Sequence, residues 1–389
     1  MTPKSPIAID LFCGAGGLSE GLRQAGFDTR VGLDFDKDAM ATFAANHPDA
    51  ERILGNVESV TGKELMLRAG ADDIDLIAGG PSCQGFSTHG KRIQDDPRNF
   101  LFKHFVRIVS EVRPKMFLME NVKGMLTFSK GAFRNQIEQA FAEIGYRCAF
   151  STVGAADYGV PQLRHRVLFI GTRIDELELS FPKPTHSDKR LGLKPYITVR
   201  EAIGDLPLMK RDYKTQTRLY SSTPQNPYQT YLRAGAGKTL TLHVSAALSD
   251  QAQRLANFIG HGEGLRAVPV RYLPERFRKM RTISTGALRH DCTTLYHRLD
   301  PDRPSYTITC YYRNVSSGPF LHPYEDRSIS HREAARLMSF PDRYEFKGVN
   351  LTRQIGNAVP VLMAKAIGQE ILKSLRSVEQ RPMKFRKVA

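Results

Sequence analysis

The chain has 389 residues, of which 41% are hydrophobic, so it is long enough for two domains with a sizeable core. Lysine and arginine number 56 against 40 aspartate and glutamate residues. The formal net charge of +16 favours a polyanionic partner such as nucleic acid, although a solvated basic surface would give the same count. No apolar run approaches the roughly 20 residues that span a bilayer, and no secretory signal is recognisable at the N-terminus. Five cysteines without Cys-x-x-Cys spacing indicate neither a zinc site nor a disulfide framework, so we expect a reduced, cytoplasmic protein without a metal.

The first 175 residues alternate between strand-like and helix-like segments, which predicts an α/β fold with a parallel sheet and helices on both faces. From about residue 186 Pro, Gly, Ser, Thr, Arg and Tyr dominate and periodicity is weak, which is typical of a loop-rich second domain. Helical patterns return at 331–339 and 359–375. In the first part we predict strands over 7–12, 29–34, 74–78, 116–119 and 167–170, and helices over 18–25 and 101–113.

A glycine-rich run at residues 10–17 (Asp-Leu-Phe-Cys-Gly-Ala-Gly-Gly) follows the first predicted strand. Glycines there permit a tight turn and close approach of a ligand to the backbone. Asp34 ends the next strand, where an acidic side chain can bind ribose hydroxyls. The run lacks the Gly-x-Gly-x-x-Gly spacing of a dinucleotide site, so these features predict an adenosine-containing cofactor without saying which, or a tight structural turn.

Three further runs lie at predicted strand ends, where ligand sites of α/β proteins form. Residues 79–87 (Gly-Gly-Pro-Ser-Cys-Gln-Gly-Phe-Ser) place Cys83 in a loop of small residues, which suits an accessible nucleophile. Glu120 ends another strand and could serve as a general acid beside it. Arg164 and Arg166 precede the strand at 167–170, and strand alternation predicts that they share one face. Taken singly, each has an ordinary structural interpretation: a buried cysteine, a helix cap, a pair of surface ion pairs.

These runs, in this order, resemble the DNA cytosine-5 methyltransferases, especially the bacterial enzymes of restriction–modification systems. The resemblance covers about residues 7–173 and 298–372. It includes Arg-Glu-Ala-Ala-Arg-Leu at 332–337, Phe-Pro-Asp at 340–342 and Gly-Asn-Ala-Val-Pro at 356–360. The region 186–297 matches nothing recognisable, and in this family that region holds the variable target recognition domain.

The resemblance implies a fold and a reaction. The fold would be a Rossmann-like methyltransferase domain formed by 1–185 and 352–389, with a smaller domain at 186–351. Cys83 would attack C6 of a flipped-out cytosine, Glu120 would bind N3 and the exocyclic amine, and Arg166 would hold the ring oxygen with Arg164 close by. The methyl donor would be S-adenosyl-L-methionine.

The same resemblance implies the binding residues and partners. The expected partner is double-stranded DNA, with a paired restriction endonuclease as a further possibility, no membrane, and a monomeric state. For DNA contacts it implies Gln84, Ser87 and Arg164. For the cofactor it implies Phe12, Gly14, Gly17, Asp34, Phe35, Asn56, Val57, Ser82, Leu101, Asn357 and Val359.

Two residues depart from the family pattern. Ser82 stands where proline is usual, and Asn56 stands where many members have an acid near adenine. The alternatives are a tRNA-methylating relative, a catalytically silent DNA-binding relative and an NAD-dependent dehydrogenase. The first would show Pro-Pro-Cys-Gln, the second would lose Cys83 or Glu120, and the third would need Gly-x-Gly-x-x-Gly.

Overall fold

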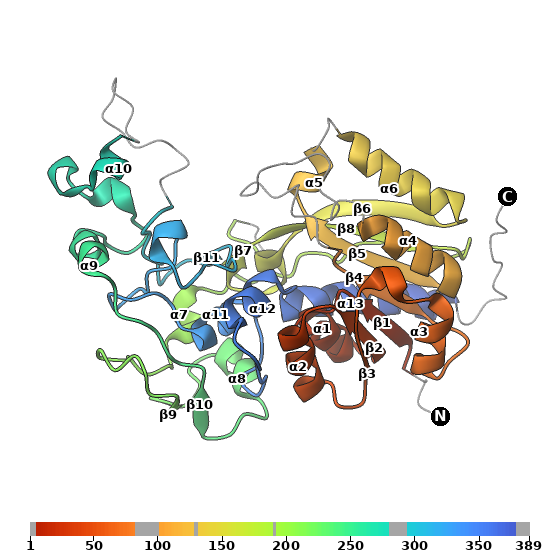
Figure 1. Cartoon of the computed structure of the whole chain (residues 1–389), viewed down its shortest axis with the longest axis horizontal. Helices are drawn as coiled ribbons and strands as arrows, with labels where there is room; N and C mark the ends of the chain where they lie inside the picture. The colour runs from red at the N-terminus through yellow and green to blue at the C-terminus, as the bar shows by residue number, and fades with distance from the viewer. Residues whose placement is uncertain (1–4, 82–100, 128–130, 190–191, 280–293, 379–389) are drawn as a thin grey trace.

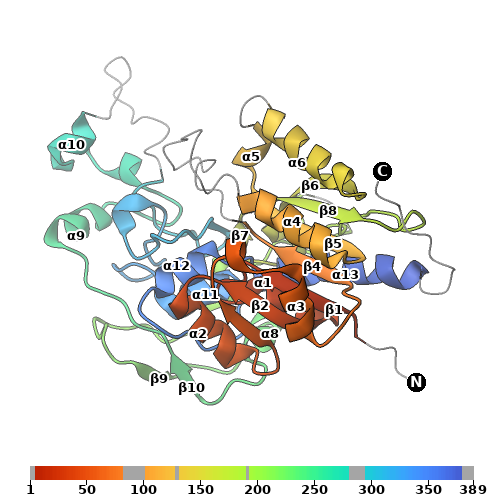
Figure 2. The same cartoon turned by 45° about the vertical axis from the view of Figure 1, so that its right-hand side comes forward.

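The protein is described here by a computed structural model, which covers residues 5–81, 101–127, 131–189, 192–279 and 294–378. It has two lobes (Figure 1). The sheet lobe contains a central β-sheet flanked by helices and includes the C-terminal helix. The second lobe, residues 186–350, has short helices and strands joined by long loops, as its weak periodicity predicts. Figure 2 shows the two lobes from a second direction, with α9 (Asp250–Ala256) and α10 (Glu275–Arg278) at the end of the second lobe that is remote from the sheet.

The sheet has seven strands in the order β3-β2-β1-β4-β5-β8-β6. The first five strands in this order are parallel, as predicted from the alternation of strands and helices. The strands are β1 (Ile7–Leu11), β2 (Asp28–Asp34), β3 (Glu51–Leu54), β4 (Leu76–Gly79), β5 (Met116–Val122), β6 (Arg147–Gly154) and β8 (His165–Thr172).

One strand corrects the expectation of a wholly parallel sheet. β8 is antiparallel to both β5 and β6. The connection from β6 to β8 contains only a 3-10 turn and the two-residue strand β7 (Gln162–Leu163), which is too short for the crossover that a parallel neighbour requires. As a result the beginning of β8 lies at the carboxyl ends of the parallel strands.

Helices cover both faces of the sheet. In β5, Phe117 and Met119 point into one core and Met116 and Leu118 into the other, as expected of a strand buried on both faces. The first face is covered by α3 (Gly62–Ala69), α4 (Leu101–Val112) and α6 (Ala132–Glu143), and the second by α1 (Gly17–Ala25) and α13 (Val361–Val378). Two further helices, α2 (Lys37–Asn46) and α5 (Gly124–Thr127), flank the sheet ends.

The second lobe packs around two smaller cores. The larger involves α7 (Val199–Ile203), α8 (Pro227–Arg233), α11 (His331–Leu337) and α12 (Leu351–Asn357), and the smaller involves α9 and α10. Two of the remaining strands, β9 (Thr217–Leu219) and β10 (Thr239–Thr241), form an antiparallel pair. The other, β11 (Ser305–Tyr306), pairs with β7 and so joins the lobes. In the described ranges no helix has the length and hydrophobicity to cross a membrane.

Candidate active site

The carboxyl ends of β1, β2, β4 and β5 meet at one edge of the sheet, because these four strands are neighbours and parallel. This edge carries the glycine-rich turn after β1, Asp34 at the end of β2, Gly80 after β4 and Glu120 in β5. The predicted sites, which are separate in sequence, are therefore brought to one place by the sheet topology.

The glycine-rich turn is held to β2 by two hydrogen bonds. The Gly14 amide donates to Asp34 Oδ2 at 2.9 Å, and the Cys13 amide donates to the Leu33 carbonyl at 3.0 Å. Gly14 has φ +52°, and a Cβ atom added there would meet no atom within 4 Å. The turn is therefore tight, and Gly14 borders open space.

Asp10 is a buried acid in the glycine-rich run, and no role was predicted for it. Its side chain is fully buried, Oδ2 accepts from the Ser19 hydroxyl at 2.6 Å, and Oδ1 has no partner among the described residues. Burial, with a smaller contribution from the nearby Asp34, raises the pKa of Asp10 to about 7. A buried carboxylate oxygen without a donor beneath this turn suits a cationic or hydrogen-bonding ligand.

The residues predicted to hold an adenosine lie around the same turn. Phe35 follows β2 and is 61% exposed, with the Arg353 guanidinium 6.0 Å from its ring centre. Asn56 is exposed and its Oδ1 accepts from the Glu58 amide at 3.2 Å, while Val57 is buried in the core. An aromatic ring this exposed at the sheet edge is a surface on which a planar base can stack.

Other predicted cofactor residues come from α1, the junction of α12 and α13, the start of α4 and the turn after β1. A Cβ atom added at Gly17 would lie 2.5 Å from the Val359 carbonyl oxygen, so Gly17 serves close packing. Val359 is buried, Asn357 is exposed at the end of α12, and Leu101 is half-buried at the start of α4. Phe12 is half-buried with φ +60°, a strained backbone for a bulky residue that marks the turn as specialised.

Glu120 and Arg166 form an ion pair at the sheet edge. Arg166 Nε lies 2.8 Å from Glu120 Oε1, and both side chains are largely buried. The antiparallel register pairs Val122 with Arg166, so the start of β8 lies beside the end of β5. Burial lowers the pKa of Arg166, and Glu120 opposes that change, so the guanidinium stays charged and faces the carboxylate.

Two contacts connect β5 to the segment that leads to Cys83. The Asn121 side chain donates to the Pro81 carbonyl at 2.9 Å. A Cβ atom added at Gly80 would lie 3.1 Å from Glu120 Oε2. Ser82, Cys83, Gln84 and Ser87 themselves lie outside the described residues. No role was predicted for Asn121 or for Gly80, although Gly80 belongs to the run at 79–87.

Arg164 lies near Arg166, and burial together with that second charge lowers the pKa of Arg164, but its hydrogen-bond partners are different. Its side chain is buried and donates to three backbone carbonyls, those of Ile308 at 3.0 Å, Gly356 at 3.2 Å and Ala358 at 3.1 Å. Gln162 lies beside it, donating to the Leu337 carbonyl and accepting from the Ile308 amide, both at 3.0 Å. These two side chains therefore bind β7 to the second lobe and to α12.

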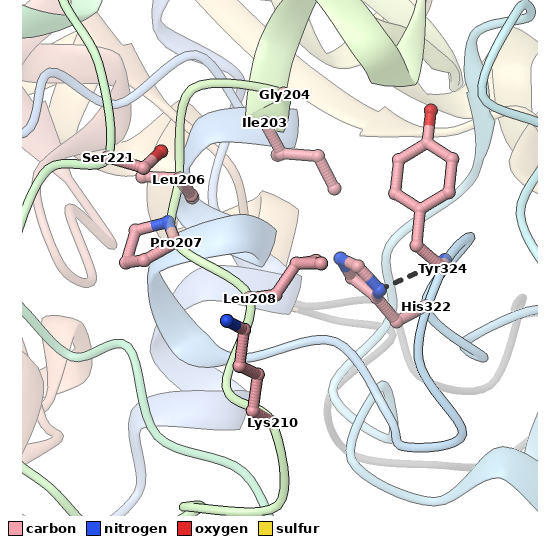
Figure 3. Close-up of a pocket in the computed structure, with 9 residues that line it drawn as sticks. All are labelled: Ile203, Gly204, Leu206, Pro207, Leu208, Lys210, Ser221, His322 and Tyr324. Carbon is pink, nitrogen blue, oxygen red and sulfur yellow. Dashed lines mark hydrogen bonds between the residues drawn. The ribbon is translucent and has the colours of Figure 1, made fainter.

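The cavity shown in Figure 3 lies elsewhere, in the second lobe. It has a volume of about 510 Å³, and its wall includes Leu206, Leu208, Lys210, His322 and Tyr324. None of the predicted site residues lines it. Among the described residues, no group of three or more His, Cys, Asp or Glu side chains is arranged to hold a metal ion.

The fold is that of the S-adenosylmethionine-dependent methyltransferases. A prophage-encoded protein from E. coli, assigned as a DNA modification methyltransferase, superposes with a TM-score of 0.74 at 28% identity, covering 96% of this chain and all of that chain. The Dnmt2 methyltransferase of S. pombe has the same fold, with a TM-score of 0.61 at 16% identity over 96% of this chain and 99% of its own.

Sequence comparison identifies the family within this class. The family model of the C-5 cytosine-specific DNA methylases matches residues 7–373. The Type II methyltransferase M.AgeI of Thalassovita gelatinovora is 35% identical over 93% of this chain and 98% of its own. M.XorII of Xanthomonas oryzae pv. oryzae is 36% identical over 97% of this chain and 87% of its own. The chain belongs to the C-5 cytosine-specific DNA methylase family and is a DNA (cytosine-5-)-methyltransferase.

Proposed function

We propose that the chain transfers a methyl group from S-adenosylmethionine to C5 of a cytosine that is flipped out of a specific double-stranded DNA sequence. The observation that carries this proposal is the buried Glu120–Arg166 ion pair at the sheet edge, beside the segment that leads to Cys83. A base within a duplex cannot reach such a recessed pair, so flipping is required.

The residues of the chain would act as follows. The Cys83 thiolate would form a bond to C6 of the ring, and the displaced electron pair would raise the nucleophilicity of C5. Glu120 would bind N3 and the exocyclic amine, and Arg166 would bind the ring oxygen, so that charge gained by the ring is stabilised. After C5 is methylated, loss of its proton to water or another base would return the electron pair and release Cys83.

The residues at the glycine-rich turn fit S-adenosylmethionine, which when bound supplies an electrophilic methyl group on a sulfonium. Asp34 would accept from the ribose hydroxyls, and the exposed Phe35 would lie against adenine. The unpartnered Oδ1 of Asp10 supports binding of the cationic amino-acid end of the cofactor. Phe12, Gly14, Asn56, Val57, Ser82, Leu101, Asn357 and Val359 would complete the site.

Arg164 was predicted to contact DNA and to sit beside the catalytic Arg166. Its three carbonyl contacts support a different proposal, in which it positions β7 and the start of β8. Gln84 and Ser87, which lie outside the described residues, remain proposed DNA contacts. The second lobe, about 186–351, would carry target recognition within 186–297, and the remaining residues would form the catalytic domain.

We also propose a setting for the activity. Several relatives are named Type II methyltransferases, which supports a role in protecting host DNA from a cognate restriction endonuclease. The expected state is a cytoplasmic monomer, since one flipped base needs one active site.

The proposed reaction is tested by a bisulfite map of plasmid DNA from a methylation-deficient bacterial host that expresses the chain. We expect 5-methylcytosine at one short motif with the intact chain and none with Cys83→Ser. DNA containing that motif with 5-fluorocytosine at the target should then form a covalent adduct with the intact chain, since fluorine cannot leave as the proton does. A methylated motif without an adduct would exclude the Cys83 role.

A further inference from the structure

The second lobe contacts the glycine-rich turn directly, through the segment 340–346 that joins α11 to α12. The hydroxyl of Tyr344 donates to the Ala15 carbonyl at 2.6 Å, and both residues are buried. Ala15 belongs to the same apolar core as Phe340, Tyr344 and Phe346, although it stands more than 300 residues earlier in the chain. The turn is therefore packed against the second lobe as well as against the sheet.

His47, at the end of α2, completes this contact. Its Nε2 lies 3.2 Å from the Tyr344 hydroxyl oxygen, and both groups are buried. Burial lowers the pKa of His47 to about 4, so the ring is neutral. The tyrosine hydroxyl donates its single proton to Ala15, so its oxygen can accept from His47 Nε2 in the tautomer that carries the ring proton there, and the Gly16 backbone also hydrogen-bonds this ring.

Gly16 allows Tyr344 and His47 to lie close to the backbone of the turn, because it has no side chain. Gly16 has φ +85°, and a Cβ atom added there would lie 2.6 Å from the Tyr344 hydroxyl and 2.7 Å from His47 Nε2. At Gly17 an added Cβ atom would lie 3.1 Å from the Phe340 ring. The two glycines that follow Ala15 thus let the second lobe approach the backbone of the turn.

The contact with Tyr344 holds the backbone of the turn next to the space where a ligand can bind. Gly14 faces open space on one side of the same turn, and Tyr344 holds the backbone one residue later on the other side. A backbone fixed by a buried hydrogen bond binds a ligand without the entropy cost of ordering a loop.

We propose that Tyr344 is a positioning residue of the cofactor site, which fixes the turn through the Ala15 carbonyl while His47 orients its hydroxyl. This inference rests on the proposed function, since it takes S-adenosylmethionine as the ligand of the turn. It assigns the second lobe a part in cofactor affinity, in addition to its proposed part in DNA recognition.

Tyr146 provides a matched control for the test. Tyr146 is equally buried and donates to the Pro114 carbonyl at 2.6 Å, the same distance as in the Tyr344 contact. Pro114 precedes β5, so this hydrogen bond lies at the opposite edge of the sheet from the site. Tyr344→Phe and Tyr146→Phe each remove one hydroxyl that donates to one carbonyl, and a general loss of stability should affect both alike.

The experiment measures S-adenosylmethionine binding to the full chain by calorimetry, thermal unfolding without ligand, and steady-state kinetics on DNA. We expect the Kd and KM for S-adenosylmethionine to rise about fivefold in Tyr344→Phe and to stay unchanged in Tyr146→Phe. The KM for DNA and kcat at saturating cofactor should change in neither variant, and the two Tm values should fall by similar amounts. His47→Leu should weaken cofactor binding less once Tyr344→Phe is present, because the histidine acts through the hydroxyl.

Other outcomes would overturn the inference. An unchanged Kd in Tyr344→Phe would exclude positioning by this hydroxyl, and an equal rise in both variants would assign the effect to general stability. If the intact chain itself binds no S-adenosylmethionine, the proposed function fails together with the inference. The intact chain therefore distinguishes that failure from a failure of Tyr344 alone.

Discussion

Gly80 lies beside the carboxylate of Glu120, in the loop that leads from β4 toward Cys83. A Cβ atom added there would be 3.1 Å from Glu120 Oε2, which is closer than most such contacts. The carboxylate is the free end of a side chain and can move by a few tenths of an ångström at little cost. That movement would disturb its 2.8 Å contact with Arg166.

Gly80→Ala is therefore expected to lower kcat about tenfold while changing the free energy of unfolding by less than about 0.5 kcal/mol. Methyl transfer at saturating cofactor and DNA measures the first quantity, and urea denaturation measures the second. Unchanged kcat would mean that the carboxylate position seen here is not the one used in the reaction.

Asp10 is a buried acid whose cost in stability depends on pH. Burial raises its pKa from 3.8 to about 7, so between these values the folded protein holds a proton that the unfolded chain has released. The stability that this proton contributes is present below pH 3.8 and is lost as the pH rises through about 7.

Asp10→Asn should thus gain stability relative to the unmodified protein as the pH rises from 5 to 8, by at most about 1.4 kcal/mol per pH unit. The same variant should bind S-adenosylmethionine more weakly, because the carboxylate charge is gone. Urea denaturation at several pH values and calorimetric binding check both parts. A stability difference that is constant with pH would contradict a raised pKa at Asp10.

The short helix α11 is buried although its sequence, Arg-Glu-Ala-Ala-Arg-Leu, is rich in charged residues. Ser330 and Glu333 form a capping box at its start, and Glu333 also pairs with the buried Arg327 at 2.7 Å. Arg336 binds Asp342, of the Phe-Pro-Asp run, at 2.6 Å, and it also binds Asp205. Burial of these charges is tolerated because each has a partner of opposite charge.

Helices α1 and α13 pack together at glycine. A Cβ atom added at Gly21 would lie 2.3 Å from the Ala364 Cβ atom and 2.7 Å from the Val361 carbonyl oxygen. Helix propensity alone favours alanine over glycine by about 1 kcal/mol. The backbone of α13 cannot give way as a flexible side chain would, so overpacking should dominate.

We expect Gly21→Ala to lower the free energy of unfolding by about 1 to 3 kcal/mol, despite the gain in helix propensity. Gly237→Ala is the control, because a Cβ atom there meets nothing within 4 Å. Chemical denaturation of both variants gives the comparison. A stabilised Gly21→Ala would show that α1 and α13 do not pack this closely.

At the scale of the molecule, several buried histidines make stability depend on pH. Burial lowers the pKa of His47 and His331 to about 4 and that of His322 to about 3. Arg313 Nη1 lies 3.1 Å from His331 Nε2, an arrangement that requires a neutral ring. Each of these histidines becomes protonated near pH 6.5 in the unfolded chain, but only near pH 3 to 4 in the folded protein.

The free energy of unfolding should accordingly fall as the pH falls from about 6.5 toward 4, by up to about 1.4 kcal/mol per pH unit for each histidine. Asp10 and Asp34 act in the opposite direction, since burial raises their pKa values, but the histidines with lowered pKa values, which also include His186, His243 and His297, outnumber them. Urea denaturation at pH 7.5, 6 and 5 tests the trend, and His47→Gln should reduce its slope. Constant stability between pH 7.5 and 5 would contradict the burial of neutral histidines.

The sequence by itself predicted the α/β class and the positions of most strands and helices that it singled out. Hydrophobic periodicity and glycine are local signals, and they gave α1 with its left-handed stop at Gly26 (φ +108°), α4 and α13 to within a few residues. The runs around Cys83, Glu120 and Arg166, taken in order, also indicated the family, because the reaction requires particular side chains at strand ends. The local sequence patterns did not predict the strands β3 and β6 or the helices α2, α3 and α6.

Only the tertiary structure decided which side chains meet. Strand alternation predicted that Arg164 lies near Arg166, and their charges do interact, but it could not predict that Arg164 binds three carbonyls of segments far away in the sequence. The net charge of the chain counts every arginine alike, yet Arg298 and Arg327 of the second lobe are buried in ion pairs. The contact of Tyr344 with Ala15 spans 329 residues and leaves no local pattern. Such contacts depend on sheet register and on the docking of one lobe against the other, and neither is determined by the residues near them in the chain.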